Sequence, residues 1–524
     1  MSEELHHECG VAALCWLGKA VARAGPASKT VRNADVAALV PSMLLDLQNR
    51  GQLAAGLSSY EPKRAQLLDT YKALGTVAEA FRMARPAKHR AILREYAGRA
   101  AIGHTRYATS GQDDTRYAQP FERHHGRLWK WFAFAFNGNL ANFTDLRDRL
   151  LKRRAYHFTL NTDTEIVMHA LAYRLRGDRP ADLVRVVSSM TRDFDGAYNL
   201  VFLDAMGRMV VARDPLGLRP LSWAVQGRLF AAASESVALA NMGFTKIHSL
   251  EPGQMAVVDN GKLRFERFAK SRQPARCFFE WIYFSNVAST IDGSNVYMAR
   301  ARSGRRLAEM EDQKMDDSCI VVPVPDTAKA AADAFAYRMG IPSVEGLIRN
   351  RYVGRTFIQP SASRSSSAKW KYTPLPAVMA GKRVFLVEDS IVRSTTLATL
   401  VCQLRRRGRA KEVHVRVACP PIVSPCFYGI DMSTVGELFA PRFLPKRRYN
   451  GLPSEAMMAK MAEALGVDSL RYLSVDDVGP CLDLPGQSLC KGCVTGKYPT
   501  VWGNELYRCA KRGAGRSASK RTYE

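Results

Sequence analysis

The sequence lacks any apolar run of the roughly 18 to 20 residues that a membrane-spanning helix needs. Its first residues, MSEELHHECG, are polar and acidic and lack the features of a secretory signal. The 11 cysteines are odd in number and scattered along the chain, so they do not form the pattern of a disulfide-linked secreted domain. These absences predict a cytoplasmic protein whose thiols serve catalysis, metal binding or core packing.

Acidic residues are scarce beside basic ones, and the formal net charge is +27. A basic surface attracts nucleic acids and phosphorylated metabolites. The sequence has no interleaved aromatic and basic pattern and no helix-turn-helix signature, so a nucleic-acid partner is not favoured. We expect a solvated basic face and a disordered basic tail at residues 511–524.

The spacing of apolar residues changes along the chain. Up to about residue 260, short apolar runs separated by glycine predict strands, with helices at 36–47 and 164–175, which is typical of an α+β domain. From about residue 317 strands and helices alternate, which predicts a parallel sheet that binds its ligand at the C-terminal ends of the strands. The strands are expected at 319–323, 383–387 and 413–418, and the helices at 296–309, 329–339 and 397–407.

The segment VFLVEDSIVRSTT at 384–396 carries the clearest ligand-binding pattern. Four apolar residues predict a buried strand, and Glu388 and Asp389 follow it directly, before a loop rich in hydroxyl groups. Backbone N–H groups at the start of the next helix suit a phosphate. The two carboxylates suit ribose hydroxyls or a magnesium ion. A surface loop that carries these residues by chance is the alternative interpretation.

Cys9, in ECGVAAL, is a candidate nucleophile. As the first residue of a processed chain its α-amine would accept the thiol proton, which requires removal of residues 1–8. A buried structural cysteine is the alternative. The motifs that follow Cys9 are RGQ at 50–52, GHTRY at 103–107, NGNL at 137–140, DTE at 163–165, RDPLGLRPL at 213–221 and SES at 234–236.

Together these motifs resemble the N-terminal-nucleophile (Ntn) glutaminase domain of glutamine amidotransferases, an α+β fold of four αββα layers. The resemblance implies that the Cys9 thiolate attacks the carboxamide of glutamine. Asn137 and the Gly138 backbone N–H would form the oxyanion hole. Arg106 would pair with the glutamine α-carboxylate and Asp163 with its α-ammonium group.

Two motifs of the C-terminal half, VVPVPDT at 321–327 and EGLIRNRYVGRTFIQPS at 345–361, together with 384–396, resemble those of amidophosphoribosyltransferases. The likeness runs from Cys9 to about Thr500. It implies a second, α/β type I phosphoribosyltransferase domain with a parallel sheet. A glutaminase alone would also fit relatives such as glucosamine-phosphate synthase, and the motifs for phosphoribosylpyrophosphate (PRPP) separate the two.

The activity implied is the first committed step of de novo purine synthesis. Glutamine, PRPP and water would give 5-phosphoribosylamine, glutamate and pyrophosphate, with ammonia passing from the glutaminase site to the PRPP site. The resemblance also suggests purine nucleotides as feedback inhibitors and a homotetramer. The expected segments are a propeptide at 1–8, the glutaminase at 9–260, the phosphoribosyltransferase at 261–480, a cluster-binding segment at 481–510 and the tail.

The residues expected to bind PRPP lie in a loop that closes over the ligand and in the segment after the predicted strand. They are Arg351, Tyr352, Arg355, Thr356, Lys371, Glu388, Asp389, Ser390, Arg393, Ser394, Thr395 and Thr396. Thr327, Glu388 and Asp389 would hold Mg²⁺.

Cys490 and Cys493 form a CxxC motif. A zinc ribbon would need a second such pair, and a redox CxxC would begin a helix, whereas Gly492 and the following VTGKYPT predict a loop. In the iron–sulfur branch of the family two distant cysteines join the pair, and Cys277 and Cys426 match them. Four thiolates suffice for a [4Fe–4S] cluster, and Cys481 is a rival ligand.

Several residues depart from the family pattern without removing a catalytic group. We therefore predict an active enzyme, with a non-catalytic PRPP- or nucleotide-sensing regulator as the alternative. The departures are Leu53 for Glu, Phe136 for His, Arg349 for Lys, Glu388 for Asp, Ser394 for Gly, and Ala328 and Lys329 for small residues.

Overall fold

The structure is a computed structural model that describes residues 9–18, 35–107, 114–153, 156–270, 273–350, 372–430, 432, 434–445 and 451–513. The predicted propeptide lies outside these ranges. So do five of the residues predicted to bind PRPP, namely Arg351, Tyr352, Arg355, Thr356 and Lys371.

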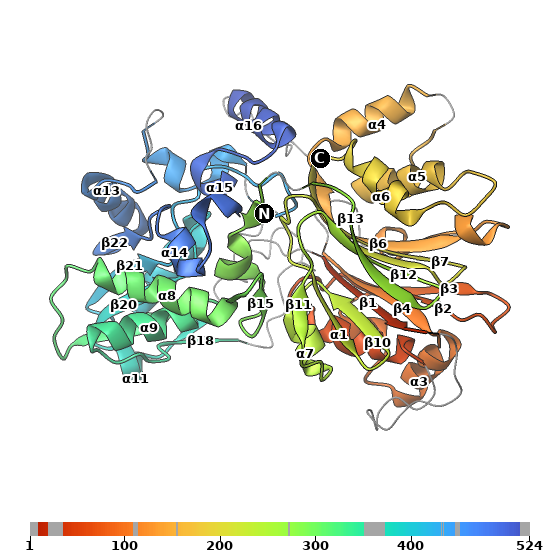
Figure 1. The fold of residues 1–524 in the computed structure, drawn as a ribbon. Helices are drawn as coiled ribbons and strands as arrows, with labels where there is room; N and C mark the ends of the chain where they lie inside the picture. The colour runs from red at the N-terminus through yellow and green to blue at the C-terminus, as the bar shows by residue number, and fades with distance from the viewer. Residues whose placement is uncertain are drawn as a thin grey trace.

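Two antiparallel sheets form one half of the molecule (Figure 1). The seven-stranded sheet has the order β11 (Ile247–Ser249), β9 (Ser222–Gln226), β10 (Leu229–Ala233), β1 (Gly10–Trp16), β4 (Ala100–Arg106), β2 (Ala54–Tyr60) and β3 (Leu68–Leu74). The six-stranded sheet has the order β13 (Lys262–Arg267), β12 (Gln254–Asp259), β8 (Met209–Arg213), β7 (Gly196–Asp204), β6 (Phe132–Leu140) and β5 (Phe121–Arg123). Strand β13 carries this sheet past the boundary expected at residue 260.

The two sheets pack face to face because their strands alternate between two apolar faces. In β1, Val11 and Ala13 belong to the core between the sheets, whereas Ala12 and Leu14 belong to the core beneath helices α1 (Val40–Asp46) and α7 (Ser236–Asn241).

In β6 the small Ala133 and Ala135 face the other sheet. Phe132, Phe134 and Phe136 face helices α5 (Asp163–Arg174) and α6 (Leu183–Thr191). Helix, sheet, sheet and helix layers result (Figure 1), which confirms the expected αββα architecture.

The other half is built on a parallel sheet in the order β17 (Cys319–Pro323), β20 (Arg383–Glu388), β21 (Glu412–Val417) and β22 (Ser469–Tyr472). Strands β17 and β20 read as nearly continuous apolar runs because helices cover both faces of such a sheet, whereas β21 alternates and carries the buried His414 and Arg416. The helices around it are α8 (Val296–Glu309), α9 (Lys329–Met339), α12 (Thr395–Arg406) and α13 (Glu455–Leu465) (Figure 1).

Most elements lie where the sequence predicts them. The strand at 319–323 and the helices at 296–309 and 329–339 have the predicted bounds. The helix expected at 36–47 is divided into a 3₁₀ turn (Ala37–Leu39) and α1, which has a proline in its first turn. Helix α12 begins two residues earlier than expected, at Thr395.

Two local predictions are wrong. Cys493 does not lie in a loop but in the one-turn helix α15 (Gly492–Thr495), after the short strand β23 (Leu489–Cys490). The first residues of the predicted tail, 511–513, end helix α16 (Val501–Gly513), where the Lys511 ammonium lies 4.6 Å from the ring centre of Tyr507. Among the described helices, none is both long enough and apolar enough to cross a membrane.

Candidate active sites

Cys9 lies directly before β1, and the pairing of β1 with β4 determines its neighbours. Gly10 is opposite Thr105, whose hydroxyl oxygen accepts a hydrogen bond from the Gly10 N–H at 3.1 Å. The end of β4 therefore lies beside Cys9, and the Cys9 thiol lies 3.6 Å from the Tyr107 carbonyl oxygen. Arg106, which lies between Thr105 and Tyr107 in the chain, is buried.

Burial raises the pKa of the Cys9 thiol, and two nearby charges act on it in opposite directions. The Arg106 guanidinium lowers this pKa and the Asp163 carboxylate raises it. The structure thus brings the two residues predicted to hold the ends of glutamine close to the predicted nucleophile, although they come from β4 and from the start of α5.

The predicted oxyanion residues lie near the end of β6. The Asn137 amide donates to the Ser234 hydroxyl at 3.5 Å, and the same hydroxyl accepts from the Val11 N–H at 3.0 Å. Ser234 thus connects β6 to β1, the strand that directly follows Cys9. Gly138 has no room for a side chain, because an added Cβ would lie 1.9 Å from the Ala197 carbonyl oxygen.

Asp163 lies beside the same turn, where the Leu140 N–H donates to its carboxylate at 3.4 Å. Burial raises the pKa of Asp163 to about 6, and this hydrogen bond opposes the shift. Because the group is ionised above that pH, it is able to receive an ammonium group at neutral pH.

The Phe136 side chain, which departs from the family pattern, does not point into this site. It packs in the core between the six-stranded sheet and its helices. Asn137, the next residue along a pleated strand, faces the opposite way, toward β1.

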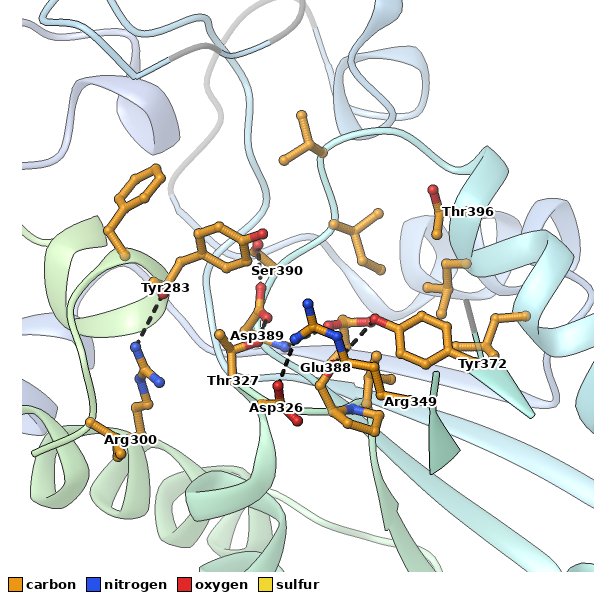
Figure 2. A pocket seen from close by; sticks show the side chains of 18 of the residues that line it. Tyr283, Arg300, Asp326, Thr327, Arg349, Tyr372, Glu388, Asp389, Ser390 and Thr396 are labelled. Carbon is orange, nitrogen blue, oxygen red and sulfur yellow. Dashed lines mark hydrogen bonds and ion pairs between the residues drawn. The ribbon is translucent and has the colours of Figure 1, made fainter. Parts of the chain in front are cut away.

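A cavity of about 400 Å³ lies at the C-terminal ends of β17 and β20 (Figure 2). Of the residues predicted for PRPP or magnesium, Thr327, Glu388, Asp389, Ser390, Arg393 and Thr396 line it. Ser394, the N-cap residue of α12, and Thr395, the first residue of that helix, are not among its lining residues.

The Asp389 carboxylate is the centre of the polar groups in this cavity. It accepts hydrogen bonds from the Thr327 hydroxyl and, at 2.7 Å, from the Ser390 hydroxyl. Both contacts are drawn in Figure 2. On the same wall Arg349 forms an ion pair with Asp326 at 2.6 Å, and the Tyr372 hydroxyl donates to the Pro325 carbonyl at 3.2 Å.

Within the described residues no three His, Cys, Asp or Glu side chains are grouped closely enough to hold a metal ion. Magnesium does not require such a group, since it usually keeps several waters and is bound by one or two carboxylates and substrate phosphates. Glu388 and Asp389, with the Thr327 hydroxyl, provide oxygen donors of that kind.

The four cysteines predicted to bind a cluster are buried and lie near one another. Cys277 in β14 (Arg276–Cys277) is directly opposite Cys490 in the parallel pair of β14 with β23. Burial raises the pKa of Cys493, and the charges of Cys277, Cys426 and Cys490 raise it further, as does that of Cys419, so these buried thiols lie close enough to interact.

A [4Fe–4S] cluster takes one thiolate per iron, so four cysteines are the number of protein ligands that such a cluster needs. Cys481 lies elsewhere, in α14 (Val478–Leu482). Its carbonyl accepts from Arg302, and burial raises the pKa of its thiol to about 11, while the Ser303 side chain lowers it.

Ser234 and the residues near 283–286 were not predicted as site residues. Ser234 belongs to the SES motif, which was used only to extend the resemblance. Tyr283, Phe284, Ser285 and Asn286 line the cavity, but they lie in and after a short helical turn (Glu280–Phe284) with no recognisable ligand-binding pattern.

The chain is similar to known proteins over most of its length. Residues 76–249 match the glutamine amidotransferase domain family. The chain is 36% identical over 468 residues to the amidophosphoribosyltransferase of Methanothermobacter thermautotrophicus, and 38% identical over 473 residues to that of Bacillus subtilis. Each alignment covers 89% of this chain and 91% of the relative.

The fold is similar to the solved structure of the glutamine PRPP amidotransferase from B. subtilis complexed with ADP and GMP. The TM-score is 0.77 at 34% identity, and the match covers 95% of this chain and 100% of that one. The chain therefore belongs to the amidophosphoribosyltransferase family.

Proposed function

We propose that this protein transfers the amide nitrogen of glutamine to PRPP and releases 5-phosphoribosylamine, glutamate and pyrophosphate. The observation that carries the proposal is the presence of two sites in one chain. One is a cysteine near Arg106 and Asp163, with Asn137 joined through Ser234 to the strand that follows the cysteine. The other is an Asp389-centred cavity at the end of a parallel sheet. Such an enzyme catalyses the first committed step of purine synthesis.

In the glutaminase half, the Cys9 thiolate attacks the carboxamide carbon of glutamine. The Asn137 amide and the Gly138 N–H donate to the oxyanion that forms, and each such donor lowers the barrier by about 3 kcal/mol. Ammonia leaves, and water hydrolyses the thioester to glutamate. The α-amine of Cys9 acts as the base if residues 1–8 are removed.

Arg106 and Asp163 select glutamine by its two charged ends. A planar guanidinium binds a carboxylate through two parallel hydrogen bonds. Asp163 binds the ammonium group, which restores to its buried carboxylate the favourable contact that water provides outside the protein.

In the second half, the Asp389 and Glu388 carboxylates bind the ribose hydroxyls, and the backbone N–H groups at the start of α12 bind the 5-phosphate. Thr327, Glu388 and Asp389 would hold a magnesium ion, which would supply positive charge to neutralise the departing pyrophosphate. The nitrogen lone pair of ammonia then forms the bond to ribose C1. Residues 351–371, which include the predicted lid, lie outside the described residues.

Cys277, Cys426, Cys490 and Cys493 are proposed to bind a [4Fe–4S] cluster. Their burial, their mutual interaction and the direct pairing of Cys277 with Cys490 support this. A cluster at this position would hold β14 and β23 to the segment that follows β21. Inhibition by purine nucleotides is proposed because the B. subtilis structure is complexed with ADP and GMP. Homotetramer assembly stays a prediction.

One assay tests the function. Purified protein is given glutamine, PRPP and Mg²⁺, and the release of both glutamate and pyrophosphate is measured, with mass spectrometry to establish whether the chain begins at Cys9. Cys9→Ala should release neither from glutamine but should still release pyrophosphate when ammonium replaces glutamine. If the protein that begins at Cys9 releases no more glutamate than Cys9→Ala, the proposal is wrong.

A further inference from the structure

A tyrosine ring covers one face of the guanidinium predicted to bind glutamine. The Arg106 Cζ lies over the Tyr117 ring, 5.3 Å from its centre. This distance is within the roughly 6 Å over which the face of an aromatic ring attracts a cation. Tyr117 ends a 3₁₀ turn (Thr115–Tyr117) that follows β4 in the chain, and it is half-buried. None of the motifs that resemble a glutaminase includes it.

The backbone of Arg106 is fixed by two contacts. In the pairing of β2 with β4 Arg106 is opposite Ala54, and its carbonyl accepts from the Leu53 N–H at 3.1 Å. Gly51 packs against the same carbonyl group, since an added Cβ would lie 2.5 Å from the Arg106 carbonyl carbon. These contacts fix where the side chain begins. They do not fix the plane of its guanidinium, because several rotatable bonds separate the two.

The turn that carries Tyr117 is held against the seven-stranded sheet. The Lys72 ammonium, in β3, donates to the Ala118 carbonyl at 2.9 Å. The Gln119 carbonyl lies so close to β2 that a Cβ added to Gly56 would be 2.4 Å from its oxygen. The backbone that follows Tyr117 is therefore held to β2 and β3, and the ring has a fixed base.

The acidic residue at the start of this turn is bound within the turn itself. The Asp114 carboxylate accepts from the Arg116 N–H at 2.8 Å and pairs with the Arg116 guanidinium at 2.7 Å. These hydrogen bonds lower the pKa of Asp114, and the nearby charge of Arg106 adds to the effect. The turn thus directs its carboxylate to Arg116 and its aromatic ring to Arg106.

Contact through the face of a guanidinium suits a site that binds a carboxylate. The N–H groups lie in the plane of the guanidinium, and a carboxylate binds at its edge through two parallel hydrogen bonds. A ring on the face does not compete for these donors, but it restricts the plane in which they lie. A group that already has its bound orientation loses less conformational freedom when the ligand arrives, which increases affinity.

We propose that Tyr117 is a positioning residue for glutamine. Its ring holds the Arg106 guanidinium in the plane in which this group binds the α-carboxylate, and it thereby favours ligands that carry that carboxylate. The inference rests on the proposed function and adds to it a residue that determines glutamine affinity and selectivity.

The test compares the KM for glutamine, the kcat of glutamate release and the ammonium-dependent rate in full-length wild type and variants. Tyr117→Leu removes the ring and should raise the KM for glutamine about 5- to 30-fold, the factor that a desolvated cation–π contact provides. Its kcat and its ammonium-dependent rate should stay within about twofold of wild type, because the lost contact acts on binding. Tyr117→Phe keeps the ring and should have a KM within about twofold of wild type.

Tyr173→Leu is the matched control. Tyr173 also lies against a guanidinium, that of Arg176 at 3.7 Å, but it is exposed and near the other end of α5 from Asp163. Loss of this second cation–π pair should leave the KM for glutamine unchanged.

Substrate selectivity separates this role from a merely structural one. Glutaminamide, in which an uncharged amide replaces the α-carboxylate, cannot accept the pair of hydrogen bonds from Arg106. The kcat/KM for hydrolysis of its γ-carboxamide should therefore differ by no more than about twofold between wild type and Tyr117→Leu. A structural role would lower kcat/KM for both substrates, and the melting temperature with them.

Three results would overturn the inference and leave the proposed function standing, because glutamate would still be released. They are a wild-type KM for glutamine in Tyr117→Leu, an equal loss with glutaminamide, and a Tyr117→Phe variant that behaves like Tyr117→Leu. If Tyr117→Leu does not fold, Tyr117→Gln, which also lacks the ring, carries the same prediction. Absence of glutamate release from the wild type would instead remove the proposed function and the inference together.

Calorimetry provides an independent readout. In Cys9→Ala protein, which does not turn glutamine over, Tyr117→Leu should raise the Kd for glutamine by about the factor by which it raises the KM. An unchanged Kd would contradict the proposal.

Discussion

Asn139, two residues beyond Asn137, donates a hydrogen bond from its side-chain amide to the backbone carbonyl of Phe427 at 3.0 Å. Phe427 directly follows the predicted cluster ligand Cys426. Arg219 also donates to the carbonyl of the next residue, Tyr428. The turn that carries the predicted oxyanion residues is thus held in place by a segment of the phosphoribosyltransferase half, so the geometry of the predicted glutaminase site depends on the other half of the chain.

Gly429→Ala should lower the glutaminase kcat about tenfold, with a smaller change in KM for glutamine. Gly429 has φ +99°, and an added Cβ would lie 3.2 Å from the Asn139 Cβ. Strain of about 1–3 kcal/mol at such a backbone position would displace the oxyanion turn. Oxyanion contacts act mainly on the transition state, so kcat should fall more than affinity.

The matched control is Gly436→Ala, because Gly436 has no heavy atom within 4 Å of an added Cβ. Steady-state kinetics on both variants test the prediction. An unchanged kcat in Gly429→Ala would show that the segment does not position the oxyanion residues.

Cys490→Ser should remove the iron–sulfur cluster, whereas Cys481→Ser should retain it. Both cysteines are buried, but only Cys490 lies opposite Cys277 and interacts with the other predicted ligands. Wild-type protein purified without oxygen should contain about four iron and four sulfide per chain, as measured by metal and sulfide analysis. Zinc in place of iron would contradict the prediction, as would equal iron in Cys490→Ser.

Thr327→Val should raise the KM for PRPP about tenfold and raise the Mg²⁺ concentration needed for half-maximal rate. The substitution removes the hydroxyl that binds Asp389, and loss of a hydrogen bond to a charged group costs about 1.5–3 kcal/mol. Thr373→Val is the control, since Thr373 lies nearby in β19 (Tyr372–Pro374) but is exposed. The ammonium-dependent rate at varied PRPP and Mg²⁺ measures this, and equal behaviour of the two variants would exclude a role for Thr327.

Glutamine binding should weaken below pH 6. Burial raises the pKa of Asp163 to about 6, so the carboxylate is charged above that pH and takes up a proton as the pH falls through it. Without the charge it no longer attracts the ammonium group of glutamine, and the Kd should rise about tenfold for each pH unit below the pKa.

Calorimetry with Cys9→Ala protein isolates this titration from that of the thiol. Asp163→Asn in the same background should bind weakly at every pH and show no acid limb. A Kd that stays constant from pH 8 to pH 5 would contradict the assignment of Asp163.

Much of the fold follows from local pattern. The runs CIVVP and VFLV are apolar throughout, and β17 and β20 are buried on both faces, because helices cover the two sides of a parallel sheet. The alternation in β1 and β6 places small residues between the two sheets and larger ones beneath helices. The local pattern did not predict the structure at Cys493. The glycines at 492 and 496 suggested a loop, but Gly492 is the first residue of a one-turn helix and Gly496 is its C-cap.

The sites were predicted unevenly. The structure brings Asp163 near Cys9, connects Asn137 through Ser234 to the strand after Cys9, and places Asp389 in the cavity. Ser394 and Thr395 were placed with them but do not line the cavity, because a residue's position in a helix turn decides which way it faces. Asn286, which lines the cavity, could not be predicted from the sequence, because it bonds to Glu235 through a backbone N–H that any residue except proline provides.

The sequence by itself determined which chemical groups this protein carries and which family it belongs to, because nucleophile, oxyanion and phosphate-binding motifs are each local and ordered along the chain. Only the tertiary structure decided how those groups meet. Cys277 faces Cys490, Asn139 reaches Phe427, and Arg50 joins Glu235 to Glu280. The physical reason is that the members of each pair are distant along the chain, and only the packing of the two halves removes them from water and brings each buried polar group within reach of its partners.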